Sequence, residues 1–159
     1  MYKLAISTSG EYVSAAIFEE KLLASFVSKT NKGSTGILLN QINELFDKTK
    51  ASRNDLNALY LDVGPGYYTG LRIGLSVSQG LGAVLGIPII PVNGLDALAF
   101  AAHTSHRKIC SLIDIKRNEF AYCEYMPVPG GVTRESDPQV ISVENLSLIH
   151  ISEPTRRLA

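Results

Sequence analysis

The sequence predicts an α/β fold in which a mixed sheet is flanked by helices, and three patterns carry this prediction. Three β-rich runs, at residues 2–9, 12–18 and 22–29, are separated by short polar breaks, which is typical of an antiparallel meander. Short apolar runs at 59–63 and 87–92 predict two further strands. Segments with helical spacing stand between and after them. This order of elements is that of a ribonuclease-H-like domain, which we expect to span residues 1–104.

The first predicted helix begins near residue 34 and ends near Lys50. Ser34 or Thr35 is a suitable N-cap, because a hydroxyl can accept a hydrogen bond from the first free N–H groups of a helix. The apolar side chains that follow recur at helical spacing and predict one buried face. These side chains are Leu38, Leu39, Ile42, Leu45 and Phe46. A last helix is predicted from Gly94 to about Ala102, with Asn93 as its N-cap.

The stretch from residue 60 to residue 74 joins the fourth strand to a helix predicted over 70–85, with Thr69 as its N-cap. Glycine and proline at 64–66 end the strand. Because the N–H groups of a helix N-terminus can bind an anion, this crossover is a possible anion site. Its residues are Gly64, Pro65, Gly66, Thr69, Gly70 and Arg72. The alternative is a tight crossover without a ligand, which we favour because neither a P-loop nor a complete dinucleotide motif is present.

The helix over 70–85 carries a small residue at every fourth position. Gly70, Gly74, Ser78, Gly82 and Gly86 therefore form one nearly bare stripe. Each interior glycine costs about 1 kcal/mol of helix stability relative to alanine, which is understandable where another backbone approaches closely. Most of the remaining circumference is apolar, so we expect burial on more than one side. One side would face the sheet, and the other a second protein surface.

Composition and motifs exclude several classes of function. Fifteen basic residues balance fifteen acidic ones, so no global field draws the chain to nucleic acid or to a membrane surface. Without a signal peptide or an apolar span, and with two isolated cysteines that fit reduced core residues, we expect a cytoplasmic protein. No catalytic motif is present. His103, His106 and Cys110 lack the fourth ligand of a zinc site, so no metal is expected.

Residues 105–145 predict the incomplete start of a second lobe. Runs at 108–115 and 119–126 form a hairpin through Lys116, Arg117 and Asn118, residues 128–138 form a loop, and 139–143 form another strand. Lys116, Arg117 and Arg107 make a small basic patch. Residues 146–159 look like translated sequencing-adapter DNA, and we treat them as a non-native tail.

About residues 2–125 resemble the TsaB (YeaZ) family of bacterial tRNA-modification proteins. The resemblance is carried by residues 64–74, 80–81, 85–88 and 95–98, with further support at 4–9 and 114–119. Two departures stand out. Tyr67 occupies a position where the family usually has serine or alanine. Ser7 occupies the position of an acid that most members keep, so magnesium has no evident anchor.

The resemblance implies a member of the actin/Hsp70/sugar-kinase-like group without catalytic residues. Family members bind a TsaD-like catalytic subunit and, with a TsaE-like ATPase, form threonylcarbamoyladenosine next to the anticodon of ANN-decoding tRNAs. The chain would need no cofactor of its own, although ATP or ADP is possible at the partner interface, and tRNA would be reached only through the complex. The same surface supports a possible homodimer.

The resemblance places the partner interface on the helices of the first domain. The residues expected there are Leu38, Ile42, Gly70, Ile73, Gly74, Val77, Ser78, Leu81 and Gly82. Two alternatives stay open. One is an ATP-dependent enzyme of the sugar-kinase-like group. The other is a homodimeric structural protein without a tRNA role.

Overall fold

The computed structural model describes residues 1–29 and 34–146, and its first half is the predicted mixed sheet. Strands β1 (Tyr2–Ser7), β2 (Tyr12–Phe18) and β3 (Leu22–Lys29) form the antiparallel meander. Strands β4 (Leu56–Asp62) and β5 (Ile89–Val92) run parallel to β1, which gives the order β3-β2-β1-β4-β5. β4 begins earlier than the apolar run predicted, after a 3₁₀ turn at Arg53–Asp55.

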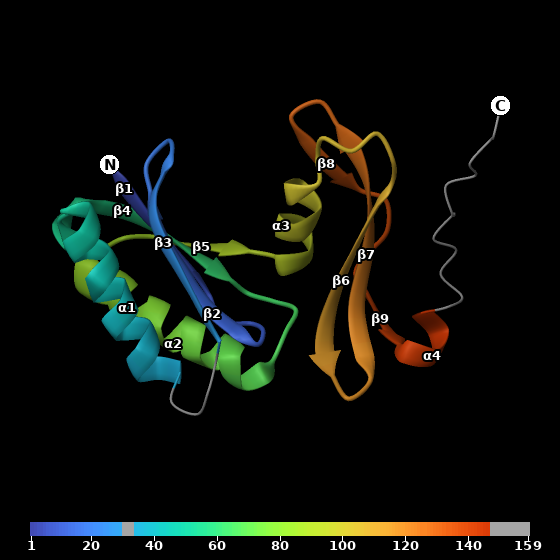
Figure 1. Cartoon of the computed structure of the whole chain (residues 1–159), viewed down its shortest axis with the longest axis horizontal. Coiled ribbons are helices and arrows are strands. Elements are labelled where there is room, and N and C mark those ends of the chain that lie inside the picture. The colour runs from blue at the N-terminus through green and yellow to red at the C-terminus, as the bar shows by residue number, and fades with distance from the viewer. Residues whose placement is uncertain (30–33, 147–159) are drawn as a thin grey trace.

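Two helices cover one face of this sheet. They are α1 (Ser34–Thr49) and α2 (Tyr68–Leu85), which lie side by side in Figure 1. The core between helices and sheet is apolar, as the helical spacing of 38–46 predicts. The core includes Leu38, Ile42, Leu45 and Phe46 of α1, Leu4 and Ile6 of β1, and Leu59 and Leu61 of β4. The prediction is wrong for Leu39, which lies at the edge of this face and is 41% exposed. The side chains of Ser34 and Thr35, the predicted caps, lie outside the described residues.

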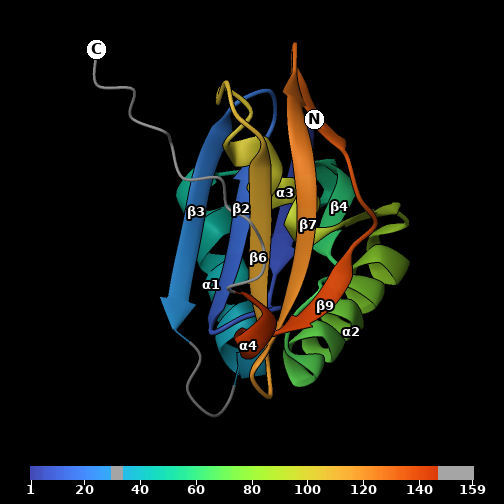
Figure 2. The same ribbon diagram turned by 90° about the vertical axis from the view of Figure 1, so that its right-hand side faces the viewer.

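The second half forms a separate antiparallel sheet, which lies in front of the first sheet in Figure 2. Its strands are β6 (Ile109–Lys116), β7 (Glu119–Val128), β8 (Gly131–Arg134) and β9 (Gln139–Ser142), followed by the short helix α4 (Val143–Leu146). The order is β6-β7-β8, and β9 also pairs with β7. Residues 128–138, predicted to be a loop, contain β8, because Gly130 at φ +82° allows a tight turn after β7.

Helix α3 (Gly94–Ala101) packs on the second sheet, although the sequence placed it in the first domain. Its N-cap is Asn93, as predicted, and the Asn93 Oδ1 accepts a hydrogen bond from the backbone N–H of Leu95 at 2.9 Å. Leu95 and Ala99 are fully buried in one cluster with Cys123 and Tyr125 of β7. By packing, therefore, the division between the lobes falls before α3 and not at residue 104.

A carboxylate on α3 strengthens this attachment. Asp96 accepts two hydrogen bonds from the Arg134 guanidinium, at 2.7 Å from Nε and 2.6 Å from Nη2, and a third from the Tyr125 hydroxyl at 2.7 Å. The Arg134 hydrogen bonds hold the pKa of Asp96 below its usual value against a smaller opposing effect of burial. Such a bidentate pair fixes orientation as well as distance.

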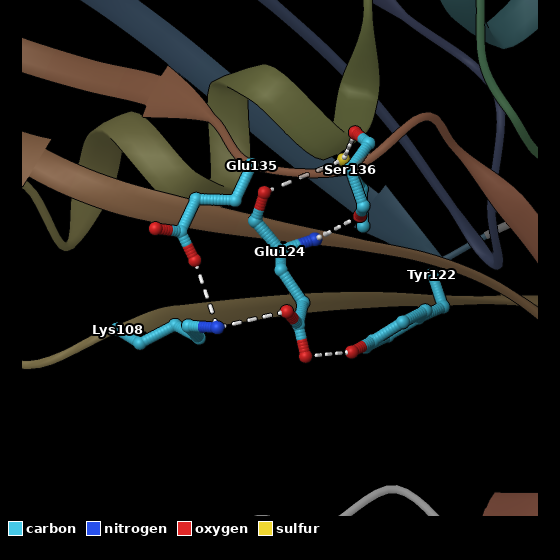
Figure 3. A network of polar contacts seen from close by, with 6 residues as sticks. Lys108, Tyr122, Glu124, Glu135 and Ser136 are labelled. Carbon is cyan, nitrogen blue, oxygen red and sulfur yellow. Dashed lines mark hydrogen bonds and ion pairs between the residues drawn. The ribbon is translucent and has the colours of Figure 1, made fainter.

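A polar network holds the chain that follows β8 against β7 (Figure 3). The Lys108 ammonium lies 3.0 Å from Glu124 Oε2 and 2.8 Å from Glu135 Oε2. Glu124 also accepts a hydrogen bond from the Tyr122 hydroxyl, and its backbone N–H donates to Ser136 Oγ at 3.2 Å. The Tyr122 hydrogen bond, followed by that of Lys108, lowers the pKa of Glu124.

The prediction of a non-native tail at 146–159 falls on residues whose side chains lie outside the described part of the chain. Among the helices of residues 1–29 and 34–146, none combines the length and the apolar character that a membrane span requires.

Candidate functional site

The crossover from β4 to α2 is held by a carboxylate that the sequence analysis did not single out. Asp62, the last residue of β4, accepts hydrogen bonds from Ser7 Oγ at 2.7 Å and Ser9 Oγ at 2.5 Å. Its other oxygen accepts from the backbone N–H of Gly64 at 2.8 Å. The sequence signal that could have identified Asp62 is an acid at the end of a buried strand, two residues before the first glycine of a Gly-Pro-Gly turn. Ser7, on β1, is therefore a hydrogen-bond donor, and the carboxylate that accepts from it belongs to Asp62 on the neighbouring strand β4.

The stripe of small residues contacts the chain itself. An added Cβ would lie 1.9 Å from the Thr8 carbonyl oxygen at Gly70 and 2.4 Å from Thr8 Oγ1 at Gly74, both in the stripe. At Gly66, which precedes α2, an added Cβ would lie 2.2 Å from the Ser9 carbonyl oxygen. Thr8 is 1% exposed, and its hydroxyl donates to the Gly70 carbonyl at 2.7 Å. The backbone that approaches closely is thus the end of β1, and the expectation of a foreign backbone on this stripe is corrected.

Helix α2 begins two residues before the sequence predicted. Its N-cap is Tyr67, whose side chain makes no capping hydrogen bond, and Thr69 lies exposed inside the first turn. The reason is a strong backbone anchor: the Tyr67 N–H donates to the Ser9 carbonyl at 2.6 Å. This holds Tyr67 in an extended conformation, and the helix starts directly after it. The prediction of Thr69 as N-cap is therefore wrong.

The structure also corrects the predicted partner-contact residues. Six of them, Leu38, Ile42, Gly74, Val77, Ser78 and Gly82, are buried within the first lobe. The other three, Gly70, Ile73 and Leu81, are half-buried. The buried side chains face the sheet because α1 and α2 use the stripe and the apolar side chains to pack on it. Any contact through these helices must use their outer residues instead.

The outer face of α2 carries large apolar side chains and one unexplained glycine. Val84 is 84% exposed, Tyr68 73% and Leu75 44%. Gly80 lies among them, exposed, and an added Cβ there would meet nothing within 4 Å. The chain's own packing therefore gives no reason for glycine in the middle of this helix. All of the exposed residues of α2 except Thr69 form what we call the outer face, namely Tyr68, Arg72, Leu75, Ser76, Gln79, Gly80, Ala83 and Val84.

A cavity of about 610 Å³ lies beside the N-terminus of α2. Of the possible anion-site residues, Gly66, Thr69 and Gly70 line it, whereas Gly64, Pro65 and Arg72 are not among its lining residues. The Arg72 guanidinium lies 5.4 Å from the ring centroid of Tyr68. From the predicted basic patch, Lys116 and Arg117 line the same cavity, whereas Arg107 precedes the opposite end of β6. The start of α2 and the β6–β7 hairpin, which are far apart in the sequence, thus line the same cavity.

Metal ligands do not gather within the described ranges. In residues 1–29 and 34–146, no three His, Cys, Asp or Glu side chains lie close enough together to hold a metal ion.

A two-lobed α/β chain with a ribonuclease-H-like first sheet, in which α2 packs through Gly70 and Gly74 on Thr8 just after β1, belongs to the actin and sugar-kinase class of folds. The family model described as "TsaD: tRNA N6-adenosine threonylcarbamoyltransferase" matches residues 26–157. The chain belongs to this family, and within it to the TsaB (YeaZ) proteins, as its resemblance indicated. The matched range includes most of the suspected tail, whose non-native origin stays a prediction.

Three similar proteins support this placement. TsaB of Buchnera aphidicola (subsp. Schizaphis graminum) is 31% identical over 77% of this chain and 60% of its own length. TsaB of Haemophilus influenzae is 30% identical over 76% and 52%. The solved structure of YeaZ from Pseudomonas aeruginosa superposes with a TM-score of 0.80 at 26% identity, over 89% of this chain and 67% of that one. The chain thus spans about three fifths or less of these curated relatives.

Proposed function

We propose that the chain is a non-catalytic subunit in tRNA threonylcarbamoyladenosine biosynthesis that binds a TsaD-like catalytic subunit through the outer face. Family membership supports the pathway, since the similar curated proteins are named for this biosynthesis. The contact rests on Gly80. It costs about 1 kcal/mol of helix stability relative to alanine, and nothing in the described chain contacts the space beside it. Close approach of a partner backbone at Gly80 would explain why glycine occupies this position.

Two observations support a role without catalysis. Position 7, where most family members keep an acid, holds a serine whose hydroxyl is engaged by Asp62. The backbone of Thr8 and Ser9, just after β1, packs closely against the glycine-rich crossover at Gly66 and Gly70. This leaves the crossover as architecture, and the alternative of an ATP-dependent enzyme loses its phosphate-binding loop.

The complex we propose has further members. A TsaE-like ATPase would be the third protein, ATP or ADP would bind at the subunit interface, and tRNA would be reached through the complex. The zero net charge of the chain agrees with this indirect contact, because nothing in its composition supplies a basic surface for RNA.

The test is co-purification of the chain with the TsaD-like protein of the same organism, with Gly80→Leu as the decisive variant. Since the added side chain enters open space on the chain's own side, the variant should fold as the natural chain does and bind the partner at least tenfold more weakly. Thr133→Leu on β8 adds a leucine at another exposed position and is the matched control. Unchanged partner affinity of Gly80→Leu would refute the proposed contact.

A second copy of the chain is the competing occupant of the outer face. Sedimentation of the chain alone and with the TsaD-like protein separates the two. A homodimer that the partner dissociates shows that both use one surface, whereas a homodimer that persists in the complex shows that they use different surfaces, and the effect of Gly80→Leu on each then tells which of them binds the outer face. A chain that dimerises and never binds the partner would instead favour the structural protein without a tRNA role.

A further inference from the structure

The tip of the β6–β7 hairpin has a backbone conformation that side chains rarely adopt. Lys116, Arg117 and Asn118 have φ values of +72°, +61° and +60°. Positive φ at both residues of a two-residue turn is normal for hairpins, but asparagine and glycine usually occupy them. Lys116 adds a third such residue, before the turn. Strained backbone of this kind persists where the surrounding structure holds it in place, and it is often found at functional residues.

The strain at Lys116 coincides with an irregularity of the strand pairing. The register between β6 and β7 shifts between Asp114 and Lys116. Such a bulge changes the direction of a side chain. Here the Lys116 ammonium lies 4.3 Å from the centroid of the Tyr67 ring and 3.7 Å from Glu11 Oε1. Tyr67 and Glu11 both belong to the first lobe, so the bulge directs Lys116 across the boundary between lobes.

The partner of Lys116 is held firmly on its own lobe. The Tyr67 N–H donates to the Ser9 carbonyl at 2.6 Å, and the Tyr67 carbonyl accepts from the Leu71 N–H at 3.0 Å. The next residue behaves differently: Tyr68 is 73% exposed and its ring faces Arg72 of the same helix. Tyr67 is also one of the departures from the family pattern noted above, so its ring is a feature of this chain.

We propose that Lys116 and Tyr67 form a clasp that holds the second lobe against the N-terminus of α2. A cation over an aromatic face is attractive, and this pair joins the two walls of the 610 Å³ cavity that both residues line. Loss of either side chain frees the hairpin tip from the first lobe and lets the two walls of the cavity move apart. The clasp goes beyond partner binding by the outer face and does not depend on it.

Amide hydrogen exchange of the whole 159-residue chain tests the clasp. Tyr67→Ala and Lys116→Met should each raise the exchange rate in both 66–71 and 115–119, by about two- to fivefold, the range of an exposed cation–π contact. The double variant should exchange no faster than Lys116→Met alone, because Lys116→Met already removes the contact with Tyr67 as well as the Glu11 ion pair. Tyr68→Ala, the matched control, should leave 115–119 unchanged.

A conservative variant separates the clasp from general loosening. Lys116→Arg keeps the cation over the ring, so it should exchange like the natural chain. Lys116 is an exposed residue at the end of β6 in the second lobe, so its replacement leaves the first lobe folded. If Lys116→Met leaves exchange at 66–71 unchanged, or if the effects of the two single variants add, the clasp is refuted, whatever Tyr67→Ala does alone.

Discussion

Gly70→Ala and Gly80→Ala make the same chemical change in the same helix and should have opposite effects on stability. At Gly70 the added Cβ would lie 1.9 Å from the Thr8 carbonyl oxygen, so helix and strand must separate by more than 1 Å. Overpacking of this kind costs about 1–3 kcal/mol. Separation also weakens the hydrogen bond from the Thr8 hydroxyl to the Gly70 carbonyl, which contributes about 1 kcal/mol.

The free energy of unfolding should therefore be lower than that of the natural chain in one variant and higher in the other. We expect Gly70→Ala to lower the free energy of unfolding by about 3 kcal/mol, since alanine recovers little helix propensity in the first turn. Gly80→Ala meets nothing and should raise it by up to about 1 kcal/mol. Urea unfolding followed by circular dichroism measures both. If the two variants unfold within about 1 kcal/mol of each other, the close approach of α2 to β1 is not as described.

Three further predictions concern the polar contacts. Asp62→Asn replaces a carboxylate oxygen that accepts hydrogen bonds by a donor, so it should lower the free energy of unfolding by about 2 kcal/mol in urea. Because Arg134 lowers the pKa of Asp96, their pair stabilises the fold above the carboxyl's unfolded pKa and is lost as pH falls through the folded one. The stability difference between the natural chain and Arg134→Met should therefore shrink from pH 7 to pH 3, and a constant difference would contradict this. Tyr122→Phe should cost about 1 kcal/mol and raise the pKa of Glu124, as a carboxyl NMR titration would show.

Most of the first lobe could be predicted from sequence because its signals are local. The meander, the apolar face of α1 and the Asn93 cap each depend on residues close together in the chain, and the structure confirms them. The start of α2 could not be found this way. Tyr67 is fixed by the carbonyl of Ser9, which lies 58 positions earlier, whereas Thr69 has the better capping side chain.

The candidate site shows the same division. Small-residue periodicity correctly identified a helix that another backbone approaches, but periodicity carries no information about which backbone that is. In the structure, the backbone that approaches closely is that of Thr8 and Ser9. Gly80, which lies off the stripe, has no internal contact. Likewise, the meeting of Lys116 with Tyr67 depends on a register shift and on the placement of one lobe beside the other, neither of which a sequence pattern encodes.

The attachment of α3 to the second sheet bears on how this protein can be cut into pieces. A fragment that ends at residue 104, where the sequence suggests a boundary, would keep α3 and expose Leu95 and Ala99, which the intact chain buries completely. Such a fragment would expose an apolar surface and would therefore tend to aggregate. A cut after Val92 retains all of β5 and leaves α3 with the lobe that covers it. Expression trials of the isolated first lobe should therefore end before Gly94.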